Sequence, residues 1–231
     1  MAVVLVTGQL LTREVWAPQA AALAGRFDLH FADHSRDDGI AGMARRLLDD
    51  APDQFDLVAQ AMGGFVAFEV MRRAPARVRS LALLATLASA DGPAQTERRQ
   101  GYIRLVEAGR FAAVVEERIR LLVAPDRRQD QALLGVIRRM AEETGAETFL
   151  RQQRAIMGRI DSRPSLADIA CPTLLIWGAQ DGITTLAHQE EIKAAIPGAR
   201  LDIIEACGHL ATLEAPERVS GLLGDWLTFP D

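Results

Sequence analysis

Residues 55–68 read Phe-Asp-Leu-Val-Ala-Gln-Ala-Met-Gly-Gly-Phe-Val-Ala-Phe, and the architecture expected of the whole chain follows from this segment. Its first six residues are typical of a buried strand, and the residues from 65 onward have the apolar spacing of a helix. Ala59 and Gly63 lie two positions before and two positions after Ala61. Small neighbours let a strand and a helix approach closely around a residue with a strained backbone. The segment therefore predicts a sharp strand-to-helix corner with residue 61 at its tip.

Short apolar segments typical of buried strands alternate with helical patterns on both sides of this corner. The expected strands cover residues 3–6, 27–31, 55–60, 78–84, 173–177 and 201–205. The expected helices cover residues 16–23, 40–48, 65–73, 186–196 and 216–227. Parallel strands need long connections, and helices supply them. We therefore predict an α/β fold with a doubly wound, mostly parallel six-stranded sheet.

Between residues 94 and 164 the strand pattern stops, and four amphipathic helical patterns take its place. Apolar residues recur there at helix spacing, with arginines and glutamates between them. We interpret this segment as a four-helix lid inserted into the sheet domain. The expected domains are a core of residues 1–93 and 165–231 and a helical lid of residues 94–164.

The expected lid is more basic than the rest of the chain. Residues 94–164 hold 14 arginines and 10 acidic residues, a net charge of +4, whereas the remainder holds 12 basic and 21 acidic residues, a net charge of −9. Charged helix faces usually serve only to keep a surface solvated, and we favour that interpretation. The alternative is a lid whose positive charge attracts an anionic substrate.

The composition of the whole chain is that of an ordinary globular protein. Of its 231 residues, 49% are hydrophobic and 25% are charged, and the formal net charge is −5. Nucleic-acid binding needs a concentrated basic surface, so we expect no nucleic-acid partner. The apolar run at the N-terminus is too short for a signal peptide or a membrane span, so we expect a cytoplasmic protein with no membrane partner. Cys171 and Cys207 lack the spacing of a zinc site, and our prediction includes no metal and no cofactor.

Four motifs in this chain resemble those of the α/β-hydrolase superfamily, and the resemblance covers essentially the whole chain. With the superfamily's pattern in parentheses, the motifs are Thr7-Gly8-Gln9 (His-Gly-x), Ala61-Met62-Gly63-Gly64 (Ser-Met-Gly-Gly), Gly178-Ala179-Gln180-Asp181 (Gly-x-x-Asp) and Gly208-His209 (Gly-His). The order nucleophile, acid, histidine is that of the superfamily. Each motif follows an expected strand, and open α/β sheets place their sites at the carboxyl ends of the strands.

The resemblance implies catalytic roles for residues of all four motifs. Residue 61 is at the position of the serine nucleophile. His209 would act as general base and later as general acid, and Asp181 would orient its imidazole. The backbone N–H groups of Gln9 and Met62 would form an oxyanion hole, which donates hydrogen bonds to the charge that develops in the transition state.

The position of the acid has a second candidate. Asp91 follows the preceding expected strand, where some members of the superfamily place their acid. Asp181 is the closer match, because it lies in the context Trp177-Gly178-x-x-Asp. We therefore favour Asp181 as the acid, although a turn-forming role ahead of Gly182 is its plainer alternative.

Alanine at position 61 leaves the site without a nucleophile, since a methyl group cannot attack a carbonyl carbon. Either a serine was replaced to give an inactive protein, or the natural protein lacks the nucleophile. We favour replacement, because an intact acid, base and oxyanion turn would serve little purpose in a protein that performs no chemistry.

The implied function is hydrolysis of a small carboxylic ester, or of a thioester or lactone, by Ser-His-Asp acyl-enzyme chemistry, so the expected partner is a small ester-type molecule. The candidate substrate-binding residues are Arg13, Tyr102, Phe111, Phe149 and Met157. Two alternatives stay open. One is an enzyme of the same fold that uses the His–Asp dyad alone, such as a C–C hydrolase, a hydroxynitrile lyase or a cofactor-free oxygenase. The other is a non-catalytic protein that binds a ligand in a degenerate site.

Overall fold

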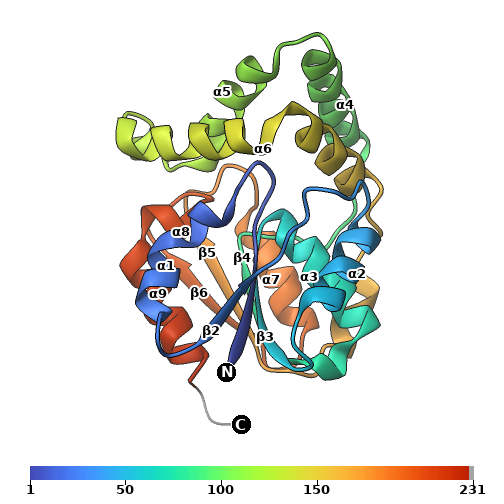
Figure 1. The fold of residues 1–231 in the computed structure, drawn as a ribbon, viewed down its shortest axis with the longest axis vertical. Helices are drawn as coiled ribbons and strands as arrows, with labels where there is room; N and C mark the ends of the chain where they lie inside the picture. The colour runs from blue at the N-terminus through green and yellow to red at the C-terminus, as the bar shows by residue number, and fades with distance from the viewer. Residues whose placement is uncertain (229–231) are drawn as a thin grey trace.

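A parallel sheet of six strands forms the centre of the molecule (Figure 1). In the computed structural model, which describes residues 1–228, the strands are β1 (Ala2–Val6), β2 (Asp28–Phe31), β3 (Phe55–Gln60), β4 (Val78–Leu84), β5 (Thr173–Gly178) and β6 (Arg200–Ile204). Their order is β2-β1-β3-β4-β5-β6, and each neighbouring pair is parallel. The predicted six-stranded α/β sheet is confirmed.

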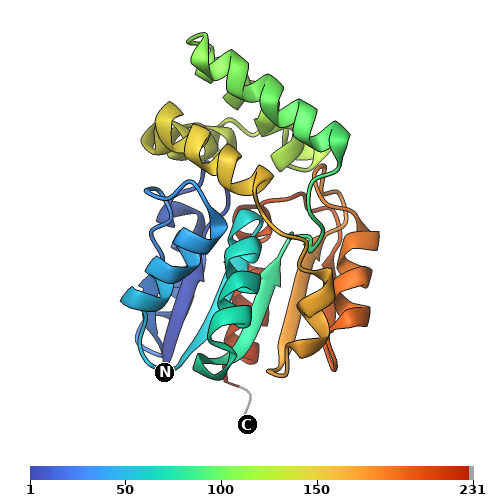
Figure 2. The ribbon, with the colours of Figure 1, turned by 90° about the vertical axis from the view of Figure 1, so that its right-hand side faces the viewer.

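Helices cover both faces of the sheet (Figure 2). One face carries α2 (Ile40–Asp50), α3 (Met62–Arg73) and α7 (Leu186–Ala195), and the other carries α1 (Ala17–Leu23), α8 (Ala211–Glu214) and α9 (Pro216–Trp226). Every residue of β3 and β5 is buried, as expected for parallel strands that are covered on both faces. The helix predicted from residue 65 begins at Met62 instead, because the backbone turns helical directly after the corner.

Between β4 and β5 the chain leaves the sheet and forms three helices beyond the carboxyl ends of the strands (Figures 1 and 2). They are α4 (Pro93–Glu107), α5 (Phe111–Leu122) and α6 (Gln131–Met157). Within α6, Gly145 has φ 77° and ψ 164°, so the helix is kinked there into two segments. We refer to residues 93–157 as the helical insertion. Short 3₁₀ turns complete the chain at Arg13–Trp16, Pro75–Arg77, Pro125–Arg127 and Arg163–Asp168.

Two side chains, the buried Gln152 and the half-buried Glu214, form hydrogen bonds between the helical insertion and the core. Gln152 Oε1, in α6, accepts a hydrogen bond of 3.1 Å from the N–H of Leu10, which follows β1. Glu214 Oε2, in α8, accepts a hydrogen bond of 2.7 Å from the N–H of Ala124, which follows α5. The same carboxylate accepts a bond of 3.1 Å from the N–H of Gly208 through Oε1. These bonds join the insertion to the core at α6 and at the segment between α5 and α6.

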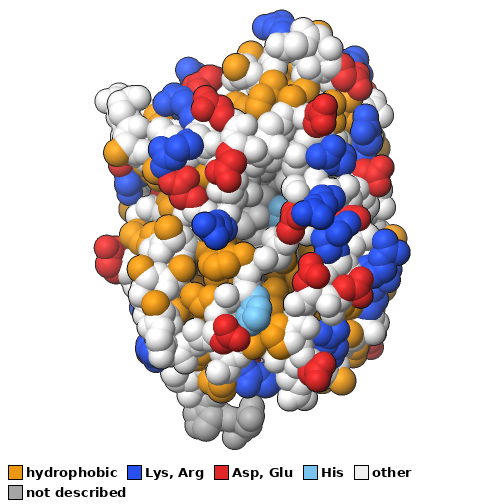
Figure 3. Space-filling model, viewed as in Figure 1, with side chains coloured by type: hydrophobic (Ala, Val, Ile, Leu, Met, Phe, Trp, Pro, Cys, Tyr) orange, Lys and Arg blue, Asp and Glu red, His pale blue; other side chains and the backbone are white. Residues whose placement is uncertain are grey.

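Basic and acidic side chains are interspersed over the helical insertion and the core on the face drawn in Figure 3. This mixture of signs favours the interpretation of the surface charges as solvating groups. Among residues 1–228, no helix is both long and apolar enough to cross a membrane.

Candidate active site

Residue 61 forms a sharp corner between β3 and α3. Its φ of 52° and ψ of −114° lie in a region that alanine rarely adopts. The N–H of Ala61 donates a hydrogen bond of 2.8 Å to the carbonyl oxygen of Leu84, and the hydroxyl of Thr86 donates one of 2.8 Å to the carbonyl oxygen of Ala61. A strained backbone persists only where its surroundings determine it. The predicted corner is confirmed, and β4 and the turn after it hold it in place.

Two glycines let the start of α3 lie against neighbouring segments. A Cβ added to Gly63 would lie 2.7 Å from the carbonyl oxygen of Val6, and one added to Gly64 would lie 2.2 Å from Thr86 Oγ1. Cβ atoms in proteins do not approach other heavy atoms so closely. Glycine at these two positions therefore allows the corner to pack against β1 and against the turn after β4.

We expect Gly64→Ala to lower the free energy of unfolding by about 2–3 kcal/mol, because the added methyl group would force the corner away from Thr86. Gly135→Ala, in α6, is the matched control, since open space surrounds its Cβ position within residues 1–228. Its better helix propensity should raise the free energy of unfolding by up to about 1 kcal/mol. Urea unfolding followed by circular dichroism measures both values, and equal effects would contradict the packing argument.

His209 and Asp181 lie together at the carboxyl ends of β5 and β6. His209 Nδ1 is 2.8 Å from Asp181 Oδ2. Asp181 Oδ1 accepts hydrogen bonds from the N–H groups of Ile183, at 2.7 Å, and Thr184, at 3.0 Å, and the Thr184 hydroxyl donates to Oδ2. These bonds fix the carboxylate, and the carboxylate fixes the imidazole through Nδ1. His209 Nε2 is therefore the ring nitrogen left for proton transfer.

Thr184 is a residue of this site that sequence analysis missed. Its hydroxyl oxygen accepts a hydrogen bond of 3.1 Å from the indole Nε1 of Trp177, so a chain of hydrogen bonds runs from the indole to His209. Aspartate side chains often bond the backbone two residues later in a turn. The sequence Asp181-Gly-Ile-Thr184 carries that signal.

The carboxyl group of Asp181 has a pKa below its usual value. Burial alone would raise this pKa, but the charge of His209 and the hydrogen bonds from His209, Thr184 and Ile183 outweigh burial. A carboxyl group whose pKa is lowered by folding stabilises the fold above its unfolded pKa, and that stability is lost as the pH falls through the folded value.

We therefore expect the free energy of unfolding to fall as the pH drops below about 4, and to fall less steeply in Asp181→Asn. Urea unfolding at several pH values between about 2.5 and 6 would measure both slopes across this window. Parallel pH profiles for the two proteins would show that Asp181 contributes no acid sensitivity.

Asp91, the second candidate for the acid, forms ion pairs elsewhere. Arg99 Nε lies 2.5 Å from its Oδ2, and an Arg159 amino nitrogen lies 2.8 Å from its Oδ1. The structure thus places Asp181, and not Asp91, beside the imidazole of His209.

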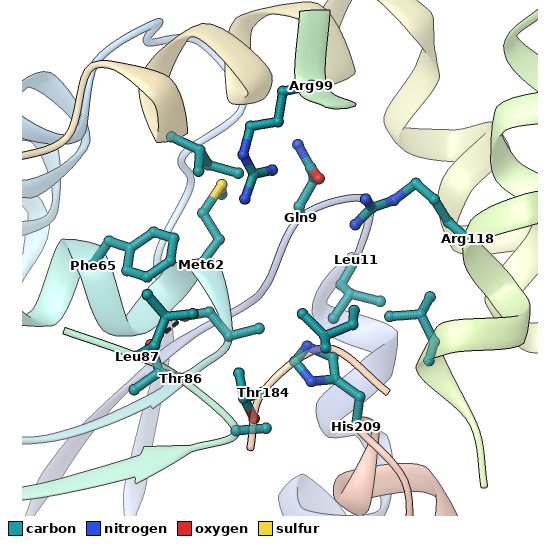
Figure 4. Close-up of a pocket in the computed structure, with 15 residues that line it drawn as sticks. Gln9, Leu11, Met62, Phe65, Thr86, Leu87, Arg99, Arg118, Thr184 and His209 are labelled. Atoms are coloured by element: carbon teal, nitrogen blue, oxygen red, sulfur yellow. Dashed lines mark hydrogen bonds between the residues drawn. The ribbon is translucent and has the colours of Figure 1, made fainter. Parts of the chain in front are cut away.

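A cavity that opens to solvent lies between the core and the helical insertion, beside residue 61 (Figure 4). The core contributes Gln9, Ala61, Met62 and His209 to its lining, and the insertion contributes Arg99, Arg118, Leu122 and Ile156. The cavity therefore brings together the expected nucleophile position, the histidine and both residues expected to form the oxyanion hole. Asp181 reaches the cavity only through His209.

The turn after β1 lies directly against the corner. A Cβ added to Gly8 would be 3.0 Å from the Cβ of Ala61. Met62 is the first residue of α3, where N–H groups have no partner within the helix and the helix dipole is positive. The backbone segments of Gln9 and Met62 thus both adjoin residue 61, as an oxyanion hole requires.

The five candidate substrate-binding residues all lie outside the lining of this cavity. Tyr102 and Phe149 are buried within the helical insertion, and Phe111 packs on Phe149 with ring centroids 5.9 Å apart. Met157 ends α6, and Arg13 borders a separate surface hollow beside the turn after β1. The apolar stripes of these helices serve the packing of the insertion itself.

Arg99 and Arg118 line the cavity, but sequence analysis did not select them. Both lie on amphipathic helices whose arginines predict a solvent-exposed face. No local pattern separates an arginine that points into a cavity from one that points into water.

The model of a family described as the alpha/beta hydrolase fold matches residues 36–216. The chain belongs to the α/β-hydrolase fold family. The family inferred from the four motifs is thereby confirmed.

The chain is 29% identical over 236 residues to a pimeloyl-[acyl-carrier protein] methyl ester esterase of Edwardsiella ictaluri, in a match that covers 93% of this chain and 88% of that protein. An esterase of the same name from Nitrosomonas europaea is 26% identical over 229 residues. That match covers 93% of this chain and 91% of the esterase.

Two solved structures have the same fold. A thermophilic esterase from Thermogutta terrifontis, solved with malate bound, superposes with a TM-score of 0.89 at 26% identity, covering 98% of this chain and 89% of the esterase. The enol-lactonase from Burkholderia xenovorans LB400 gives a TM-score of 0.88 at 23% identity, covering 99% of this chain and 91% of the lactonase.

Proposed function

We propose that this chain carries the site of a serine hydrolase of small carboxylic esters. Residue 61 is the nucleophile position, His209 the general base and Asp181 the residue that orients it. The observation that carries the proposal is the 2.8 Å hydrogen bond between His209 Nδ1 and Asp181 Oδ2, beside a cavity that is also lined by the strained residue 61.

With serine at position 61, the reaction would proceed in two halves. The serine hydroxyl attacks the ester carbonyl while His209 Nε2 takes its proton, and that proton passes to the departing alcohol as the acyl-enzyme forms. Water then attacks the acyl-enzyme, with the same nitrogen as base, and releases the carboxylic acid. The N–H groups of Gln9 and Met62 would stabilise the oxyanion in both halves.

The domain division follows from the same proposal. Residues 1–93 and 165–231 form the catalytic core, of which residues 229–231 lie outside the described part of the chain, and residues 94–164 act as a lid that covers the site. The position of the helical insertion beyond the carboxyl ends of the strands supports this role, because the cavity lies between the insertion and the core. A lid over the site would shield the acyl-enzyme from bulk water.

We infer that the chain with Ala61 forms no acyl-enzyme, because it has no nucleophile. The positive φ of Ala61 supports replacement of a serine. A strained backbone at this position brings no benefit to a protein without chemistry, whereas it is the usual conformation of a nucleophile at such a corner.

The names of the relatives support a carboxylic ester as the substrate. Two of them are named as esterases of pimeloyl-[acyl-carrier protein] methyl ester. A thioester or a lactone would react through the same acyl-enzyme and stays within the proposed chemistry.

The intact dyad beside Ala61 favours one second function. His209, oriented by Asp181, could abstract a proton from a substrate without any serine. Turnover of such a substrate by the chain with Ala61 would support this dyad chemistry.

The proposal is tested by covalent labelling. A fluorophosphonate probe should label Ala61→Ser at residue 61, because a serine beside a base is nucleophilic, and should leave the chain with Ala61 unlabelled. Mass spectrometry of the digested protein identifies the labelled residue. Failure of a folded Ala61→Ser protein to react would overturn the proposal.

A further inference from the structure

Three polar side chains converge on the part of the cavity that lies away from His209 (Figure 4). Gln9 comes from the turn after β1, Arg99 from α4 and Arg118 from α5. In the close-up, the two guanidinium groups approach Gln9 from either side, and the imidazole lies at the opposite end of the cavity. The cavity therefore has a basic end and a catalytic end.

The side chain of Gln9 is buried without hydrogen-bond partners. It is 7% exposed, and neither its Oε1 nor its Nε2 has a partner within residues 1–228. A buried amide that is left unpaired is costly. A ligand in the cavity that accepts a hydrogen bond from Nε2 would explain why this side chain is held there.

Arg118 is a half-buried cation that forms no ion pair with any residue of the described chain, 1–228. Its Nε has no hydrogen-bond partner among the described residues, and its guanidinium lies 5.6 Å from the ring centroid of Tyr102 and 6.0 Å from that of Phe149. Burial, followed by the positive charge of Arg99, lowers the pKa of Arg118 to about 10, so the group stays charged at neutral pH. The neighbouring carboxylate of Glu117 accepts a hydrogen bond from the Tyr102 hydroxyl.

Arg99 is held in position but only partly neutralised. It is paired with Asp91, and one of its amino groups donates a hydrogen bond of 3.2 Å to Gln153 Oε1. The carboxylate of Asp91 is shared with Arg159. Two guanidinium groups thus share one carboxylate, which leaves this cluster with a net positive charge beside the charge of Arg118.

Accepting the esterase function proposed above, on which this inference rests, we propose that Gln9, Arg99 and Arg118 form a subsite for a carboxylate of the substrate. The preferred substrates are then small esters that carry a free carboxylate, such as half-esters of dicarboxylic acids. Planar guanidinium groups suit a carboxylate, and the amide of Gln9 adds a further donor. The apolar part of the lining, which includes Leu11, would contact the methylene chain between the carboxylate and the ester.

Binding to the chain with Ala61 tests the subsite without turnover. Monomethyl adipate and methyl hexanoate serve as probes, because both carry a methyl ester on a six-carbon chain and only the first has a carboxylate. Isothermal titration calorimetry should show monomethyl adipate binding roughly tenfold or more tightly, with a preference that weakens as salt is added. Equal affinity for the two probes would overturn the proposal.

Arg118→Gln and Arg120→Gln form a matched pair, since Arg120 lies on the same helix and is exposed. Arg118→Gln should weaken binding of monomethyl adipate roughly tenfold to hundredfold and leave binding of methyl hexanoate unchanged. Arg120→Gln should change neither affinity. Arg118→Gln should also raise the Tm of the ligand-free protein, because it removes a half-buried charge that forms no ion pair within residues 1–228. A lower Tm with an unchanged preference for the half-ester would assign Arg118 a purely structural role.

The outcomes separate this proposal from the esterase function. If Ala61→Ser hydrolyses methyl hexanoate as fast as monomethyl adipate, the esterase function stands and the carboxylate subsite fails. If Ala61→Ser hydrolyses neither ester while the Ala61 chain binds only the half-ester, the subsite stands and the esterase function fails. Binding of coenzyme A that depends on Arg118, without any preference for the half-ester, would overturn the carboxylate assignment in favour of a phosphate.

Discussion

Ala61→Ser is expected to raise kcat/KM for hydrolysis of small carboxylic esters by at least about 10⁴-fold. The dyad, the strained corner and the N–H groups that adjoin it are already in place, so the variant would add only the missing nucleophile. Spectrophotometric assays with a panel of p-nitrophenyl esters, thioesters and lactones measure the gain. A rapid initial release of p-nitrophenol would report the acyl-enzyme.

Ala61→Gly is the control for this prediction. Glycine adopts the positive φ of residue 61 without strain and supplies no nucleophile, so the variant should be at least as stable as the chain with Ala61 and equally inactive. Comparable turnover by Ala61→Ser and Ala61→Gly would contradict the role assigned to residue 61.

In the serine-restored chain, Asp181→Asn is expected to lower kcat by about 10³- to 10⁴-fold. An asparagine amide in this place would favour the wrong tautomer of His209 and could not stabilise the imidazolium that forms when the serine is deprotonated. Steady-state kinetics with a carboxylic ester of the panel measures kcat and KM separately. The loss should fall on kcat, because Asp181 reaches the cavity only through the imidazole.

The chain offers a matched control in a second His–Asp pair. His30 Nε2 lies 2.9 Å from Asp28 Oδ2 on the exposed edge strand β2. Asp28→Asn removes an interaction of similar length, and kcat should stay within about twofold, since exposed ion pairs contribute little. A similar loss of kcat in both variants would point to a general effect of removing aspartates.

Local sequence was sufficient to predict the sheet and the corner. The strands at 55–60 and 78–84 were predicted with the bounds that the structure has, because continuous apolar runs leave few alternatives once both faces are covered. The sequence also predicted that the two residues of the dyad lie close together. Asp181 and His209 follow adjacent strands, and parallel strands bring their carboxyl ends to one edge.

The lining of the cavity could not be predicted in the same way. Tyr102 and Phe149 belong to apolar helix stripes, and periodicity shows that such a stripe is buried but not what it is buried against. The position of Arg118 depends on how α5 packs on α6, which only the tertiary structure determines. The kink at Gly145 is a further example, since an isolated glycine within a helical pattern does not reveal the direction that the chain takes after it.

The hydrogen bonds of Gln152 and Glu214 bear on how molecules enter and leave the cavity. The first joins α6 to the turn that carries Gln9, and the second joins Ala124, after α5, to Glu214, whose carboxylate also bonds Gly208 next to His209. A movement of the whole insertion away from the core would break both bonds and would disturb the segments next to Gln9 and His209. Both bonds oppose such a movement, so we expect ligands to enter through the existing opening of the cavity, without displacement of the insertion.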